Sequence, residues 1–231
     1  MEDYDKNIRS LTVFEGKNRF IEAGFPVNKY RLVRTEEEAV KFAKEIGFPV
    51  VLKIVSPKIL HKTDVEGIIL NLKDDEEVSQ AFNKLMKIMR KHDPSCMESE
   101  KTGIMVEEMV EDGAETIIGG FTDESYGKVI IFGLGGIFVE ILQDVSFRLA
   151  PIEEYDAWEM VKGIKGSKIL LEGYRGKGPY DVEKLIDIIV KVSKFFHKRE
   201  EILEFDLNPI FVLPKGKGVK IVDVRVILKS D

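Results

Sequence analysis

Two kinds of apolar pattern alternate along this 231-residue chain, and this alternation constrains the fold more than any other feature. Residues 49–55 and 67–72 form short, nearly continuous apolar runs that are typical of buried strands. Elsewhere apolar residues recur at helical spacing. The longest such pattern follows Asp74 and Asp75, and its apolar face comprises Val78, Ala81, Phe82, Leu85, Met86 and Met89. Strands interleaved with helices predict a layered α/β or α+β fold.

Residues typical of helix starts and helix ends, together with further apolar patterns, predict where the remaining helices and strands lie. Thr35 and Glu38 form a capping box that opens a helix, and Gly47 ends it. Further helices are expected at residues 11–23, 153–163 and 181–197. Further strands are expected at residues 29–33, 103–109, 115–121, 128–134, 145–149, 202–213 and 219–228.

Composition removes several classes of protein. The chain has 35 basic and 41 acidic residues, and this acidic balance argues against a general nucleic-acid binder. A single cysteine excludes a disulfide framework. The polar start has no signal-peptide pattern and no apolar run is long enough to span a membrane, so we expect a cytoplasmic protein. The 33% charged residues and scarce Gln and Cys fit either a thermophilic source or genomic bias.

Lys53 interrupts the apolar run of residues 49–55. A buried ammonium needs a partner, because an unpaired buried charge is costly, and a nucleotide phosphate would serve. A lysine that reaches solvent from an edge strand fits the same pattern.

His61 lies in the polar loop that follows, at residues 56–66. Imidazole is a nucleophile that can carry a phosphoryl group covalently, and Asp64 could orient the ring. An ordinary exposed histidine is the alternative. The loop lacks periodic apolar positions, so we expect the whole segment to move between two sites.

Two further segments offer a backbone surface to a ligand. Residues 106–110 (VEEMV) end a strand, where exposed backbone can pair with adenine, although the segment taken alone favours ordinary solvated acids at a strand end. The glycines of residues 133–136 (GLGG) allow close approach to a phosphate or to another chain. This glycine block matches neither the Rossmann nor the P-loop motif.

Oxygen donors gather near the C-terminus. Asp206 and Asn208 are two residues apart in a predicted strand and therefore share a face. Asp223 falls in the strand that is expected to pair with it as a hairpin. Three such donors on adjacent strands predict a Mg²⁺ site. A turn at Asn208-Pro209 with a cross-strand charge pair is the competing interpretation.

The order of these features resembles the ATP-grasp fold, in which nucleotide binds between two subdomains. Two sequence blocks point to one group within the ATP-grasp proteins. The first is SPKILHKTDVEG at residues 56–67, and the second is GLGGIFVE at residues 133–140 followed by DVSFRLAP at residues 144–151. Over about residues 11–226 the chain is similar to the β subunit of archaeal ADP-forming acetyl-CoA synthetase, an acyl-CoA synthetase related to succinyl-CoA synthetase.

This resemblance implies a reversible reaction in which acyl-CoA, ADP and phosphate give acid, CoA and ATP. His61 would accept a phosphoryl group from the α subunit and pass it to ADP, and Lys53 would contact the nucleotide phosphates. Catalytic roles are also implied for Arg148 and Glu140. The other nucleotide contacts would come from Glu107, Glu108, Met109, Val110, Glu115, Gly135 and Gly136.

The resemblance also implies a metal site and a domain organisation. Asn208 and Asp223 would bind Mg²⁺, with Asp206 close by. Residues 1–22 would form an N-terminal helix region, residues 23–105 a subdomain that carries the His61 loop, and residues 106–231 a subdomain with the adenine-binding segment and the metal site. No Rossmann segment opens the chain, so an α subunit is expected to bind CoA in an α2β2 assembly.

Two other functions fit part of the pattern. A carboxylate–amine ligase of the ATP-grasp type would use an acyl phosphate directly and would not need His61. A nucleotide-sensing regulatory module would tolerate the loss of metal ligands. The presence of His61 together with Asp206, Asn208 and Asp223 favours the synthetase.

Overall fold

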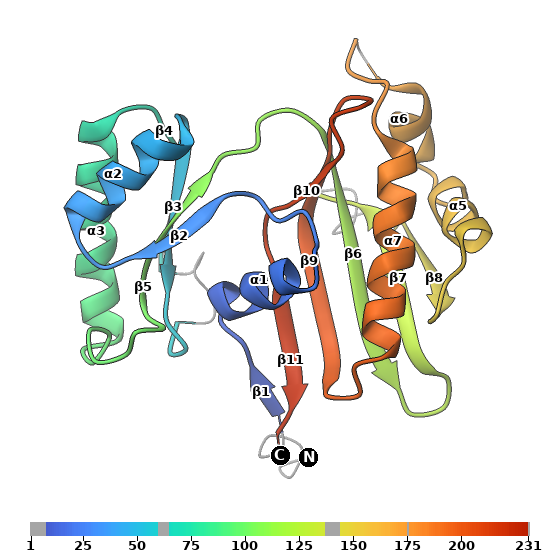
Figure 1. Cartoon of the computed structure of the whole chain (residues 1–231), viewed down its shortest axis with the longest axis horizontal. Helices are drawn as coiled ribbons and strands as arrows, with labels where there is room; N and C mark the ends of the chain where they lie inside the picture. Colours follow the sequence, from blue (N-terminus) through green and yellow to red (C-terminus); the bar gives the residue numbers. More distant parts are fainter. Residues whose placement is uncertain (1–7, 60–64, 137–143, 175, 231) are drawn as a thin grey trace. The chain divides into compact units, whose positions relative to one another are not determined.

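The computed structural model describes residues 8–59, 65–136, 144–174 and 176–230 (Figure 1). The chain divides into two compact units, each with its own core. The small unit contains residues Thr12–Glu15 and Asn28–Met109. The described parts of Met1–Leu11, Gly16–Val27 and Val110–Asp231 form the large unit.

The small unit is a four-stranded antiparallel sheet that is covered by two helices. Its strands run in the order β2 (Tyr30–Val33), β5 (Gly103–Glu108), β3 (Val50–Val55) and β4 (Ile68–Leu72). Helices α2 (Glu36–Ile46) and α3 (Asp75–His92) pack against each other and the sheet (Figure 1). The Thr35 capping box is present, Asp74 caps α3, and the six predicted apolar positions of α3 are all buried.

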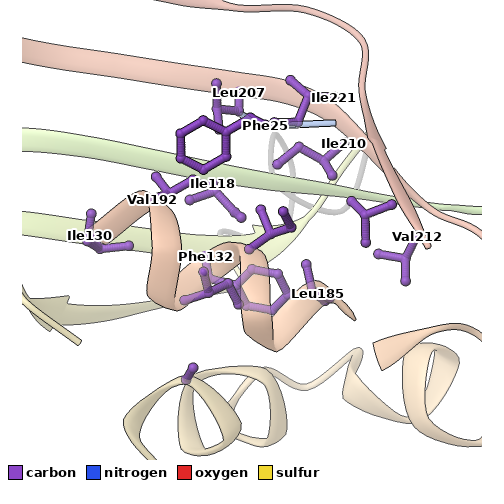
Figure 2. Packing of buried hydrophobic residues seen from close by; sticks show 14 of the residues in the cluster. Phe25, Ile118, Ile130, Phe132, Leu185, Val192, Leu207, Ile210, Val212 and Ile221 are labelled. Atoms are coloured by element: carbon purple, nitrogen blue, oxygen red, sulfur yellow. The ribbon is translucent and has the colours of Figure 1, made fainter. Parts of the chain in front are cut away.

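The large unit is built on an antiparallel sheet of seven strands. Their order is β1 (Ile8–Ser10), β11 (Arg225–Lys229), β9 (Ile202–Val212), β6 (Ala114–Asp123), β7 (Gly127–Leu134) and β8 (Val145–Leu149), and β10 (Val219–Ile221) also pairs with β9. Four helices contribute to its core: α1 (Val13–Glu22), α5 (Glu154–Gly163), α6 (Ser167–Glu172) and α7 (Val182–His197). Figure 2 shows side chains of α7 meeting those of the sheet, with Leu185 and Val192 near Phe132 and Ile118.

Strand pairing defines two faces of the large sheet. Residues paired across antiparallel strands lie on the same face. Phe205, Gly120, Ile130 and Arg148 are paired in register, and Phe205 and Ile130 belong to the core, so this is the helix-covered face. The adjacent register positions lie on the opposite face, which we call the open face; they are Asp206, Gly119, Ile131 and Phe147. Phe147 is 50% exposed there.

The structure differs from the sequence expectations in several places. Two short elements, β1 and α6, were not expected, and the last predicted strand is two strands, β10 and β11, separated at residues 222–224. Asp223 therefore lies between strands rather than in one. The boundary between the units falls after Met109, because β5 continues to Glu108, and residues 16–27 belong to the large unit. Among the described helices, none combines the length and apolar character needed to cross a membrane.

Candidate functional site

Lys53 is buried in the middle of β3, a strand that is paired on both sides. Only 6% of the residue is exposed, and its Nζ lies 2.8 Å from Oε2 of Glu107, which has no exposed surface. The pairing of Val51 with Glu107 places this carboxylate one position along the same face of the sheet. The explanation by an edge-strand lysine is therefore wrong, because Lys53 lies in an internal strand and its ammonium pairs with a carboxylate of the same unit.

The backbone of the predicted adenine-binding segment is held by its own unit up to Met109. The N–H of Glu108 donates to the carbonyl of Lys29 at 2.9 Å, and Asn28 Nδ2 donates to the carbonyl of Glu108 at 3.0 Å. The N–H of Met109 donates to the carbonyl of Pro49 at 3.3 Å. Asn28 is almost fully buried, at 1% exposed, and sequence reasoning missed it because no motif marks a buried asparagine that binds backbone. Val110 begins the next stretch of the large unit.

The predicted metal ligands lie together on the large unit. Asp206 and Asn208 share a hydrogen bond. Burial raises the pKa of Asp206 to about 6, and the negative charges of Asp223 and Glu204 act in the same direction. The Arg225 guanidinium, on the residue paired with Asp206, opposes this effect but does not cancel it. A carboxyl group crowded by other carboxylates is one that a cation would stabilise in its charged form.

A β-bulge in β9 orients Asn208. Thr116 of β6 pairs with Ile210 and Ile118 pairs with Leu207, so Asn208 and Pro209 together face a single residue of β6. The extra residue shifts the alternation: Leu207 and Ile210 are both buried, whereas Asn208 is exposed. The N–H of Val222 donates to the carbonyl of Pro209 at 3.0 Å, and this bond brings the segment with Asp223 next to the bulge. Bulges of this kind are frequent next to active sites, where they redirect a side chain.

The three predicted ligands, Asp206, Asn208 and Asp223, are of the chemical type that Mg²⁺ prefers. Two carboxylates and one amide oxygen are hard ligands, and Mg²⁺ completes its shell with water and phosphate oxygens. Within the described ranges, no group of three or more His, Cys, Asp or Glu side chains is arranged to hold a metal. The site thus offers a partial shell, typical of a magnesium ion that is bound mainly through a substrate's phosphates rather than by a closed protein cage.

Glu115, Gly135 and Gly136 also lie together. The N–H of Gly135 donates to the carbonyl of Glu115 at 2.8 Å. A methyl group added at Gly135 would lie 3.1 Å from Cβ of Glu115, and Gly136 has a φ of +66°, which favours glycine. The structure therefore brings together three residues that the resemblance assigned to the nucleotide, at the ends of β6 and β7.

Of the residues with implied catalytic roles, Arg148 lies within the part of the chain that the structure describes. Arg148 pairs with Ile130 on the helix-covered face of the sheet, and its Nη1 donates to the carbonyl of Phe147 at 2.8 Å. Asp206 lies on the open face, so the structure does not bring Arg148 together with the metal-site residues. His61 and Glu140 lie outside the described residues, and so does Asp64.

Known proteins that resemble this chain over nearly its whole length identify its family. Residues 4–228 match the model of a family described as ATP-grasp domain. The chain is 46% identical over 220 residues to the β subunit of ADP-forming acetate–CoA ligase I of Pyrococcus furiosus, covering 95% of this chain and 92% of that protein.

Two solved structures of the dinucleotide-forming acetyl-coenzyme A synthetase 1 of Ca. Korarchaeum cryptofilum are also similar. One, described with coenzyme A, Ca-AMPCP and HgCl+, matches with a TM-score of 0.87 and 45% identity over 96% of this chain and 94% of that one. The other is described with coenzyme A, Mg-AMPPCP and a phosphohistidine segment pointing towards the nucleotide binding site. It matches with a TM-score of 0.81 and 43% identity over 95% and 93%. The chain therefore belongs to the ATP-grasp family and, within it, to the β subunits of ADP-forming acetate–CoA ligases.

Proposed function

We propose that this chain binds ADP and Mg²⁺ and transfers a phosphoryl group between His61 and the nucleotide, within an ADP-forming acyl-CoA synthetase that uses acetyl-CoA. The observation that carries the proposal is the grouping of Asp206, Asn208 and Asp223 around a β-bulge, with the pKa of Asp206 raised to about 6 by burial and by neighbouring carboxylates. This grouping supports a cation site on a surface that can take phosphates.

Each residue has a separate task in this proposal. Lys53 contacts the nucleotide phosphates and is held ready by Glu107. The N–H groups of Glu108 and Met109 already donate within the small unit, so adenine pairs with backbone carbonyls of Glu108 and Met109 and with the backbone of Val110. Glu115, Gly135 and Gly136 provide further nucleotide contacts. Asp206, Asn208 and Asp223 hold Mg²⁺, which when bound would offset the negative charge of the phosphates.

The proposed transfer step balances without any other reactant. In the direction of ATP formation, an oxygen of the ADP β-phosphate attacks the phosphorus on His61. A P–O bond forms, the N–P bond breaks, and the ring nitrogen recovers its electron pair. In the reverse direction the neutral imidazole attacks the γ-phosphorus of ATP. Imidazole has an ordinary pKa of about 6.5, so a free ring is mostly neutral at pH 7 and above.

The proposal includes a partner. The Pyrococcus relative is named as a β subunit. We propose that an α subunit carries the chemistry on CoA and the carboxylate and phosphorylates His61, in an α2β2 assembly.

Mapping of a phosphoryl label tests the proposal directly. Incubation of the chain with Mg-ATP should give an acid-labile, alkali-stable phosphoprotein, and ADP should discharge the label as ATP. The chain has three histidines, so His92→Ala and His197→Ala are matched controls for His61→Ala. Only His61→Ala should lose the label while it still binds ADP.

The same experiment separates the other functions. A carboxylate–amine ligase would retain activity without His61, and a regulatory module would bind nucleotide without being labelled. A label that persists in His61→Ala, or that maps to His92 or His197, would contradict the assignment.

A further inference from the structure

A compact set of hydrogen bonds ties the chain just after β3 to the end of α3. Ser56 Oγ donates to Oδ2 of Asp93 at 2.8 Å, and Lys58 Nζ donates to Oδ1 of Asp93 at 3.0 Å. Ser95 Oγ also donates to Oδ1 of Asp93, at 2.9 Å, and Lys58 Nζ lies 2.5 Å from Ser95 Oγ. The N–H of Lys58 donates to Ser56 Oγ at 3.1 Å. We call these four residues, Ser56, Lys58, Asp93 and Ser95, the clasp.

The clasp is buried at its centre. Asp93 is 2% exposed and Ser56 is 4% exposed, whereas most of the Lys58 side chain is in solvent. Burial alone would raise the pKa of the Asp93 carboxyl. Hydrogen bonds from Lys58, Ser56 and Ser95, together with the charge of Lys58, hold this pKa below its ordinary value. Both carboxylate oxygens are therefore used, and the ionised form is the one that the clasp binds.

Apolar contacts extend the fixed region past the clasp. The N–H of Ile59 donates to the carbonyl of Ser56 at 3.2 Å, and Ile59 is 5% exposed in the core of the small unit. On the far side of residues 60–64, Val65 packs against the same core and Gly67 accepts a hydrogen bond from the N–H of Ile54 at 2.9 Å. The sequence expectation of a segment without apolar anchors over residues 56–66 is therefore wrong at both ends.

We infer that Asp93 is a positioning residue for phosphoryl transfer at His61, because the clasp fixes the point from which the histidine segment starts. This inference rests on the proposed function of His61. His61 follows Ile59 by two residues in the sequence, so the clasp and Ile59 hold the stretch of chain that immediately precedes it. Transfer depends on reacting atoms that are held within a fraction of an ångström of the productive geometry, so loosening the starting point should slow the chemical step.

Single-turnover labelling with Mg-ATP, measured beside ADP affinity, tests this inference in the full chain. Asp93→Ala removes both acceptors and should slow labelling of His61 by at least about tenfold. Asp93→Asn retains one acceptor oxygen and should fall between the wild type and Asp93→Ala. ADP affinity should be nearly unchanged in both variants, since neither touches the residues proposed to bind nucleotide.

A matched control separates positioning from general loosening of the small unit. Glu36 joins α2 to α3 through hydrogen bonds with Ser79 and Asn83, far in the sequence from the clasp. Glu36→Gln should lower the unfolding temperature yet leave the labelling rate at the wild-type value. If Asp93→Ala does not fold, Ser56→Ala serves, since it removes a hydroxyl that both donates to Asp93 and accepts from Lys58.

The outcomes also distinguish this inference from the proposed function. Wild-type labelling at His61 with unaltered rates in Asp93→Ala, Asp93→Asn and Ser56→Ala would overturn the positioning role alone. A slow rate in Glu36→Gln equal to that of the clasp variants would overturn it too. A wild-type chain that takes no label at His61 would overturn the proposed function and, with it, this inference.

Discussion

At the scale of single residues, each unit carries charged groups whose surroundings differ from those in the other unit. Lys53 and Glu107 are buried and neutralise each other at 2.8 Å. Asp206 is partly buried near other carboxylates, and its pKa rises to about 6. The first pair brings opposite charges together within one unit, whereas a bound cation would favour the ionised form of Asp206. A charged group that remains unfavourable without its ligand is a common feature of functional sites.

Removal of a metal-site donor should stop turnover without unfolding the chain. Asn208→Ala or Asp223→Ala should abolish magnesium-dependent labelling, because each takes away a hard oxygen ligand. Asn208 is exposed, so its replacement should change the free energy of unfolding by no more than about 1 kcal/mol. The measurement is labelling rate against Mg²⁺ concentration, with Asp187→Ala, on the exposed side of α7, as the control. Wild-type Mg²⁺ dependence in both variants would remove the metal assignment.

Asp93 should make the stability of the small unit depend on pH at the acid end. Its folded-state pKa lies below the ordinary value, so ionised Asp93 stabilises the folded state above about pH 4, the unfolded value, and this stabilisation is lost as pH falls through the folded-state pKa. Asp93→Asn should cost about 2 kcal/mol near pH 7 and much less once the pH has fallen below the folded-state pKa of Asp93. Denaturant unfolding of both proteins across this range measures it. A difference that stays constant with pH would show that the charge of Asp93 contributes nothing.

At the scale of elements, paired strands rather than single motifs create the site. Strands β3 and β5 bring Lys53 and Glu107 together, and the bulge between β6 and β9 turns Asn208 outward. Both arrangements depend on register, which a slip of one residue would reverse. In each unit the sheet therefore determines which side chains stand at the proposed nucleotide and metal sites.

The pairing of β3 and β5 places Lys53 beside Glu107, so replacing either residue should change the free energy of unfolding of the small unit. Lys53→Met leaves the Glu107 carboxylate buried without the ammonium and should destabilise the small unit by about 3 kcal/mol. Lys53→Met combined with Glu107→Met should recover most of this loss, because two apolar side chains suit a buried sheet face. The double variant should still fail to bind ADP tightly. Unfolding and ADP titration of the three proteins measure this. Normal ADP affinity in the double variant would exclude Lys53 from the nucleotide site.

At this scale the sequence predicted the buried faces of helices better than the faces of strands, and the reason is physical. The buried face of α3 was predicted residue by residue, because helical period is a local property. The face on which Arg148 lies was not predicted, because β8 has five residues and its orientation depends on pairing with β7. The bulge at Asn208 and the contact of Asn28 with Glu108 were missed for the same reason: both depend on segments distant in the chain.

At the scale of the whole molecule, the chain assigns different tasks to its two units. Lys53, Glu107 and the clasp belong to the small unit, and the metal-site residues belong to the large unit. The two-subdomain organisation was expected from the resemblance to the ATP-grasp fold, not from the pattern of elements, and the chain divides into two compact units. The boundaries between the units could not be predicted, since residues 106–109 belong to the small unit and residues 16–27 belong to the large one.

The most direct test of the account is ATP formation by the chain together with a CoA-binding partner, from acetyl-CoA, ADP and phosphate. The wild type should form ATP, acetate and CoA in equal amounts, because one phosphoryl group passes through His61 for each thioester consumed. His61→Ala should bind ADP but form no ATP, and His92→Ala should match the wild type. ATP formation by His61→Ala at the wild-type rate would contradict the account.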